Sequence, residues 1–96
     1  MAKKVNKYQL TLQQTELADG SPVANEPIKL DIENHDEIFG IVDYLQRKNP
    51  FDDPKQAAEF SIGLKLFSEV MIKNKNNHLF DELLPAFKIF MGKLKT

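Results

Sequence analysis

Two stretches of the chain alternate apolar and polar residues with a period of two. They cover residues 7–13 and 28–33, and their apolar positions are Tyr8, Leu10, Leu12, Ile28, Leu30 and Ile32. This period places one set of side chains on a single face of a strand. The span between the two stretches contains Gly20, Pro22 and Pro27, which favour turns. The pattern predicts an antiparallel β-hairpin with a long loop.

A helical pattern follows the second strand. Asn34 can cap the first free backbone N–H groups, and Glu37, three residues later, completes a capping box. Pro50 disfavours helical geometry at Asn49, so the helix cannot continue past that residue. We therefore predict a helix that begins at Asn34 and buries a stripe formed by Ile38, Ile41, Val42 and Leu45.

The next helix has the most apolar surface of the three. Asp53 is suited to cap it, Pro54 fits its first position, and Gln56 completes a second capping box. The helix should run to about Asn74. Its apolar residues occupy more than half of the helix circumference, so it needs cover on two sides; they are Phe60, Ile62, Leu64, Leu66, Phe67, Val70 and Met71.

A last helix is predicted from about Glu82 to Lys95. Pro85 would clash with a backbone carbonyl if the helix began as early as His78, so residues 78–81 are expected to form a short turn. The apolar stripe has helical spacing and consists of Leu83, Ala86, Phe87, Phe90, Met91 and Leu94.

These elements define an α+β fold: an antiparallel β-hairpin followed by three α-helices packed on one face. With 96 residues the chain is one domain, residues 1–96, and residues 1–6 are expected to form a flexible N-terminal tail. A two-stranded hairpin is marginal by itself and both of its outer edges are open. It therefore needs to pack on the helices or to pair with a second copy, and a homodimer is one expected arrangement.

Composition narrows the classes of function. The chain has no cysteine, which fits a reducing compartment, and its N-terminal stretch lacks the apolar run of a signal peptide or membrane span. We therefore expect a cytoplasmic protein that does not contact a membrane. Net charge is −1, but residues 16–59 carry eleven acidic and four basic residues. This acidic middle argues against a nucleic-acid partner.

The densest polar cluster is Asn34, His35, Asp36 and Glu37. An imidazole beside carboxylates can act as a general base or a metal ligand. Caps and acids are also favoured at a helix start for purely structural reasons, and this interpretation is preferred. We assign no catalytic residue, no cofactor and no metal, and we keep Asn34, His35 and Asp36 as a candidate ligand or partner site.

Three further residues complete the candidate site. Lys65 and Glu69 are four residues apart on the polar side of the second helix, where an exposed ion pair is expected unless a partner covers them. Phe39 lies off the main stripe of the first helix. It is either a second contact to the hairpin or an exposed anchor for a partner.

Phenylalanine and glycine residues have structural interpretations. The helical spacing of Phe60, Phe67, Phe80, Phe87 and Phe90 indicates a core and not a surface for stacking on bases. Glycine within a helix costs roughly 1 kcal/mol relative to alanine. Gly40 and Gly63 are therefore expected to mark close helix packing.

Several segments of the chain resemble a known family. They are residues 33–39, 63–67, 69–71, 79–80 and 90–91, and the resemblance extends from Tyr8 to Lys95. The sequence is similar to the bacterial domain-of-unknown-function family 3861. The resemblance implies a bacterial cytoplasmic protein of unassigned role, and it provides no catalytic residues that can be transferred to this chain.

Two classes of function remain. The preferred hypothesis is a non-enzymatic interaction or accessory domain, with self-association left open, because the hairpin edges are open and the second helix has surplus apolar surface. The alternative is a small-molecule-binding domain or minor enzyme. Its pocket would lie near the start of the first helix, between the hairpin and the helices, beside His35, Asp36 and Lys65.

Overall fold

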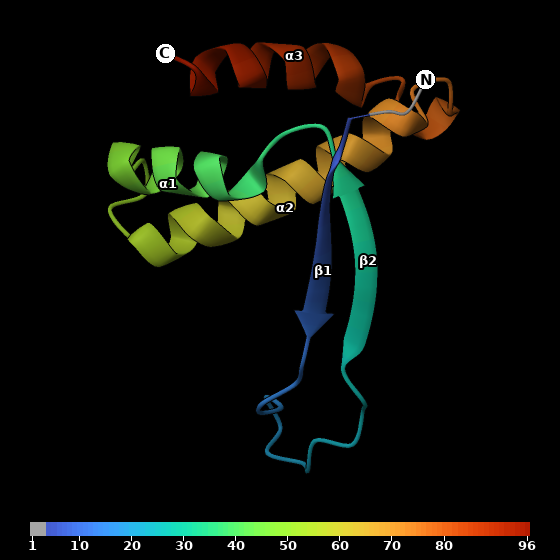
Figure 1. The fold of residues 1–96 in the computed structure, drawn as a ribbon, viewed down its shortest axis with the longest axis vertical. Helices are drawn as coiled ribbons and strands as arrows, with labels where there is room; N and C mark the ends of the chain where they lie inside the picture. The colour runs from blue at the N-terminus through green and yellow to red at the C-terminus, as the bar shows by residue number, and fades with distance from the viewer. Residues whose placement is uncertain (1–3) are drawn as a thin grey trace.

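The computed structural model describes residues 4–96. The predicted order of two strands and three helices is confirmed, with one short 3₁₀ turn between the last two helices (Figure 1). The elements are β1 (Asn6–Leu12), β2 (Ile28–Asn34), α1 (Ile38–Lys48), α2 (Pro54–Lys73), η1 (His78–Phe80) and α3 (Leu83–Leu94). Residues 1–3 of the expected tail lie outside the described residues, and Asn6 already belongs to β1.

The two strands form an antiparallel hairpin that extends away from the helices (Figure 1). Its register pairs the apolar residues with one another, so they share one face; the pairs are Tyr8 with Ile32, Leu10 with Leu30, and Leu12 with Ile28. The helices lie at the end of the hairpin where β2 finishes, and the long loop of residues 13–27 lies at the opposite end. We call residues 9–31 the hairpin arm.

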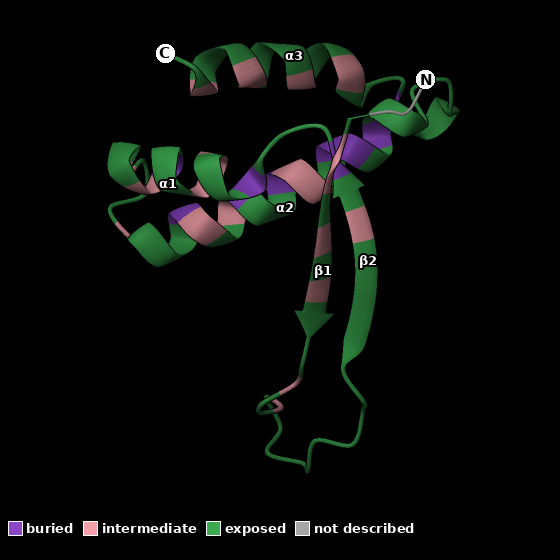
Figure 2. Cartoon of the chain, viewed as in Figure 1, coloured by how far each residue is buried: buried purple, intermediate pink, exposed green. Residues whose placement is uncertain are grey.

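The best-buried part of the molecule lies where α1 packs against α2. α2 buries one stripe along its length, and Ile38 and Leu45 are the buried residues of α1 (Figure 2). Three side chains of the stripe are small. The stripe consists of Ala57, Ser61, Leu64, Ser68 and Met71.

The predicted large apolar face of α2 is therefore only partly the buried face. Leu64 and Met71 are buried, but Phe67 and Val70 are exposed. Ser61 can be buried because its hydroxyl donates a hydrogen bond to the carbonyl oxygen of Ala57 at 2.6 Å. Sequence periodicity identified the surplus apolar surface and two of the buried residues, but it did not identify the small buried residues Ala57, Ser61 and Ser68.

The ends of the helices confirm two predictions and contradict one. Asp53 caps α2 by accepting a hydrogen bond from the Lys55 N–H, and Pro54 is the first helical residue, as predicted. α1 begins later than predicted, because Glu37 and not Asn34 is its N-cap and accepts from the N–H groups of Phe39 and Gly40. The helix ends as expected, and Asn49 adopts a left-handed conformation there with φ of 52°.

α3 is the most loosely held helix, and none of its residues is buried (Figure 2). It contacts the rest of the molecule through a chain of phenylalanine rings whose neighbouring centroids are 5.2 to 6.3 Å apart. In order of contact they are Phe51, Phe60, Phe90, Phe87, Phe67 and Phe80. The predicted aromatic cluster therefore exists, but of these rings only Phe80 is buried.

The prediction that Gly40 and Gly63 mark close helix packing is wrong. A Cβ atom added at Gly63 would have no neighbour within 4 Å, and one at Gly40 would make an ordinary contact with Glu37.

None of the helices within residues 4–96 has the length and apolar character needed to cross a bilayer.

Candidate functional site

The chain makes a tight, polar connection between β2 and α1, and this connection packs against the side of α2. Asn34, the last residue of β2, is buried. Its side-chain N–H₂ donates to the Lys65 carbonyl oxygen at 3.1 Å, and its side-chain oxygen accepts from the Asp36 N–H at 2.9 Å. Asn34 thus shapes the turn and attaches it to α2, a role different from the predicted helix cap.

Two side-chain pairs lie on either side of this amide. His35 Nδ1 is 3.0 Å from Glu69 Oε1, and the His35 backbone N–H donates to the same oxygen at 3.0 Å. Lys65 Nζ is 2.9 Å from Asp36 Oδ2. We call Asn34, His35, Asp36, Lys65 and Glu69 the polar joint.

The polar joint overturns the expectation that Lys65 and Glu69 form an exposed pair with each other. Their side chains are 14% and 9% exposed, and each is paired with a residue of the β2–α1 connection. Sequence spacing indicated that the two residues share one side of α2. It could not show that the chain following β2 would cover that side.

The hydrogen bonds of the polar joint set the charge of Glu69. Burial acts to raise the pKa of this carboxyl. Hydrogen bonds from the backbone and ring of His35 act in the opposite direction, as do electrostatic interactions with His35 and Lys73. Together they outweigh burial and lower the pKa below its ordinary value of 4.5. Glu69 is therefore ionised at neutral pH. A general base works best with a pKa near the operating pH, so this carboxylate is better suited to holding the joint together.

Tyr8 of β1 fixes the other side of the β2–α1 connection. Its hydroxyl accepts a hydrogen bond from the Ile38 N–H at 2.9 Å and donates one to Glu37 Oε1 at 3.2 Å. Sequence analysis treated Tyr8 only as an apolar strand residue. The available signal was the phenol itself, because a half-buried tyrosine usually finds a partner for its hydroxyl.

Phe39 lies apart from the polar joint and contacts the hairpin. Its ring stacks on that of Tyr8 with a centroid distance of 6.1 Å and an interplanar angle of 26°. The side chain is nevertheless 73% exposed. The first of the two predicted roles, a contact to the hairpin, is thus present, and the exposed face of the ring remains a candidate anchor for a partner.

A shallow hollow of about 370 Å³ lies over the polar joint, lined by Asn34, His35, Asp36, Ser68, Glu69 and Ile72. The His35 side chain is 60% exposed. The titratable groups of the hollow already take part in the two side-chain pairs described above. Within residues 4–96, no set of three or more histidine, aspartate or glutamate side chains is placed to hold a metal ion.

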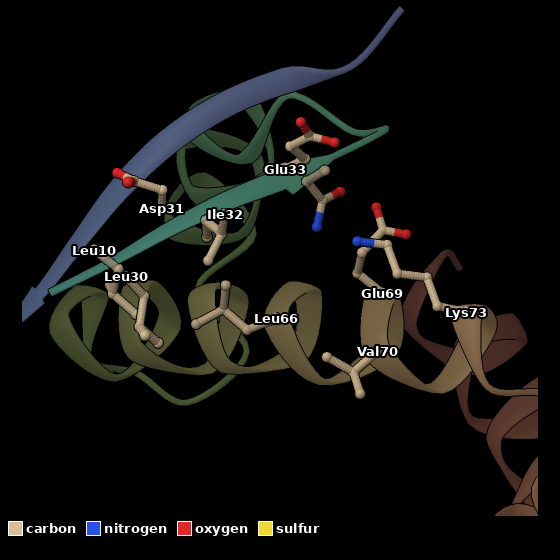
Figure 3. A pocket seen from close by; sticks show the side chains of 10 residues that line it. Leu10, Leu30, Asp31, Ile32, Glu33, Leu66, Glu69, Val70 and Lys73 are labelled. Atoms are coloured by element: carbon tan, nitrogen blue, oxygen red, sulfur yellow. The ribbon is translucent and has the colours of Figure 1, made fainter. Parts of the chain in front are cut away.

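A second depression lies between the hairpin and α2, and sequence analysis missed it. It has a volume of about 420 Å³ (Figure 3). We call it the apolar groove; its apolar lining is Leu10, Leu30, Ile32, Leu66 and Val70, and Glu33, Glu69 and Lys73 are among its polar residues. Leu30 and Val70 are exposed. The groove arises because the hairpin meets α2 only at its root.

The fold and this site define a small α+β domain with no assigned chemistry, and the chain belongs to the family described as a domain of unknown function with a solved structure, DUF3861, whose model matches residues 6–96. The resemblance inferred from sequence is thereby confirmed. The chain is also similar to a protein of unknown function from Pectobacterium atrosepticum SCRI1043, known from a crystal structure at 2.20 Å resolution. Sequence identity is 29%, the match covers 96% of this chain and 98% of that chain, and the TM-score is 0.81.

The organism of that structure suggests a bacterial origin for this chain. None of the curated proteins matches the chain significantly.

Proposed function

We propose that this chain is a non-enzymatic interaction domain that works as a pair of identical copies. One observation carries the proposal. The accessible surface of the chain is 7942 Å², whereas a folded monomer of 11.0 kDa is expected to expose about 5,600 Å². The surplus is about 2,300 Å² per chain on that scaling.

The size of the surplus matches what a permanent dimer buries. Two chains that each cover about 2,300 Å² would form an interface near the upper part of the 2,000 to 5,000 Å² range of obligate complexes. The long loop of the hairpin contributes to the surplus, so the interface itself is expected to be smaller. A specific interface requires roughly 1,000 Å².

The shape and the surface chemistry support the same proposal. The radius of gyration is 16.1 Å, compared with about 12.5 Å for a compact domain of this length. Large apolar side chains are exposed on several elements, among them Leu12, Leu30, Phe67, Val70 and Ile89. Extensive exposed apolar surface on a protein typically marks an interaction site.

Sedimentation equilibrium over a range of protein concentrations tests the proposal. We expect a mass of twice 11.0 kDa at micromolar concentration. A mass of 11.0 kDa at high micromolar concentration would contradict self-association. A monomeric chain would favour the hypothesis that a different protein binds the same apolar surface.

The hollow over the polar joint supports a second candidate function, the binding of a small molecule. It is the less favoured proposal because the charged groups that would recognise a ligand are paired within the chain. Ligand screening by thermal shift distinguishes the two: a compound whose stabilising effect is lost in His35→Ala would favour this alternative.

We propose a cytoplasmic location for either function, supported by the cysteine-free composition.

A further inference from the structure

We infer that the two copies meet through their hairpin arms, packed face to face, so that the outer end of each arm covers the apolar groove of the other copy. This inference rests on the proposed self-association and adds the surface, the relative orientation and the residues in contact. It commits to a second copy of this chain as the occupant of the groove.

The arm has one face that lacks cover within its own chain. The three apolar pairs of the hairpin lie in a row. Tyr8–Ile32 is at the root, Leu10–Leu30 borders the groove beside α2, and neither residue of the outer pair is part of the groove lining. Leu12 and Ile28, at the outer end, are 66% and 55% exposed. An isolated two-stranded hairpin is marginally stable in water and needs packing on its apolar face.

The opposite face of the arm is polar and suited to contact with solvent. Alternate residues there are polar or charged, and within the arm they are Gln9, Thr11, Lys29 and Asp31. Pairing of two hairpins edge to edge would leave the Leu10–Leu30 and Leu12–Ile28 pairs without cover, whereas face-to-face packing covers them. The chemistry of the two faces therefore selects the face-to-face arrangement.

The apolar groove continues the same strip onto α2. Leu10 and Leu30 line the groove together with Leu66 and Val70, which come from α2 (Figure 3). Val70 is 56% exposed. Each chain thus presents an uninterrupted apolar strip that begins at the outer end of the arm and ends on its own second helix.

A twofold axis makes this strip complementary to itself. If the axis passes beside the central Leu10–Leu30 pair, the two arms run in opposite directions and each central pair contacts its own counterpart. The outer Leu12–Ile28 pair lies about 7 Å along the strands from the central pair. In the dimer, this outer pair lies opposite Leu66 and Val70 in the groove of the other copy. Because the contact is twofold symmetric, it joins two copies and forms a closed dimer.

Cysteine cross-linking tests this orientation, since the chain has no cysteine of its own. Leu10→Cys is expected to give a covalent dimer with a short bis-maleimide, because residue 10 lies beside the axis. Gln9→Cys, the next residue and on the polar face, is the matched control and should stay unlinked. A mixture of Leu12→Cys and Val70→Cys proteins should give the mixed cross-linked dimer.

Charge placed at the outer end of the arm provides a second test. Leu12→Lys with Ile28→Lys should raise the dimer dissociation constant roughly 100-fold or more, because the lysines would enter an apolar contact. Both side chains are exposed in the single chain, so the helices should keep their circular dichroism signal. Val23→Lys, an exposed position in the loop, is the control and should leave the dissociation constant unchanged.

The outcomes separate the two proposals. If the wild-type chain is a monomer, self-association and the arm contact are both overturned. If the wild-type chain is a dimer that survives Leu12→Lys with Ile28→Lys and Leu10→Cys does not cross-link, the arm contact alone is overturned. A dimer that meets all three expectations supports the arrangement described here.

Discussion

The α1–α2 pair and the hairpin arm use apolar residues in opposite ways. The helix pair buries a few side chains completely, and two of the buried residues in its stripe are as small as Ala57 and Ser61. The arm carries larger apolar residues, Leu12, Ile28 and Leu30, and leaves them exposed. Close approach of backbones requires small side chains, whereas a surface that binds another molecule gains most from large ones.

This difference indicates that stability and association reside in separate parts of the molecule. The helix pair and the polar joint hold the chain together, and the arm with the outer side of α2 provides the surface for a partner. A change in the first region should alter unfolding, and a change in the second should alter the mass of the assembly. The following predictions test that separation, from the largest expected effect to the smallest.

Leu45→Ala should produce the largest loss of stability. The side chain is 1% exposed, and its truncation leaves a cavity in the best-packed region. We expect the free energy of unfolding to fall by about 2–5 kcal/mol. Urea denaturation at fixed protein concentration measures the change, and Leu79→Ala, at an exposed position in η1, is the control that should have little effect. Equal losses in the two variants would show that the helix pair is not the stable region.

Glu69→Gln should weaken the polar joint by about 1–3 kcal/mol, because a buried carboxylate with two hydrogen bonds from His35 becomes a neutral amide. The pKa of Glu69 is lowered in the folded chain, so the unfolded chain binds its proton more readily. The stability that Glu69 provides is therefore present above pH 4.5 and is lost as pH falls through the lowered pKa.

Unfolding measured against pH checks this prediction. Below pH 4.5 the stability of the wild-type chain should fall more steeply than that of Glu69→Gln. Asp43→Asn is the matched control, since Asp43 pairs with Arg47 on the exposed side of α1. Its effect should stay below about 1 kcal/mol. Parallel pH curves for the wild type and Glu69→Gln would show that the polar joint does not contribute as inferred.

Gly63→Ala should stabilise the chain by roughly 0.5–1 kcal/mol, because alanine favours the helix and a Cβ atom there has no neighbour within 4 Å. The same substitution at Gly20 should destabilise, since Gly20 has a φ of +78° that alanine rarely adopts. Thermal unfolding of the two variants checks both signs. A destabilising Gly63→Ala would indicate that a partner packs directly on this part of α2.

Lys48→Met should have the smallest effect on unfolding, a few tenths of a kcal/mol, because the interaction is exposed. Lys48 Nζ donates to the carbonyl oxygens of Leu94 and Thr96 at 2.5 and 2.6 Å and so attaches the end of α3 to α1. Amide hydrogen exchange in α3 should become faster. Lys88→Met, on an exposed position of α3, is the control, and equally fast exchange in both variants would argue against this attachment.

Sequence patterns predicted the elements of the fold because those patterns are local. Alternation gave the two strands, and Asp53 with Pro54 gave the start of α2. The start of α1 was wrong for a tertiary reason. Asn34 is an effective cap in isolation, but here its amide bonds the Lys65 carbonyl oxygen, thirty-one residues away.

The candidate site was predicted in its residues but not in its arrangement. His35, Asp36, Lys65 and Glu69 were all identified, yet their pairing depends on how the β2–α1 connection lies across α2, which spacing within either segment does not encode. The apolar groove was missed for the same reason. Periodicity revealed the excess apolar surface of α2, and only the position of the hairpin root shows where that surface remains open.

The loop of residues 13–27 has a practical consequence for anyone who wishes to label this molecule. It is exposed over most of its length and lies at the end of the arm farthest from the helices (Figure 1). Such a loop tip tolerates inserted sequence well. In the twofold arrangement inferred above, an epitope inserted beside Gly20 would be displayed twice and in opposite directions, so a two-armed antibody would link neighbouring dimers into chains.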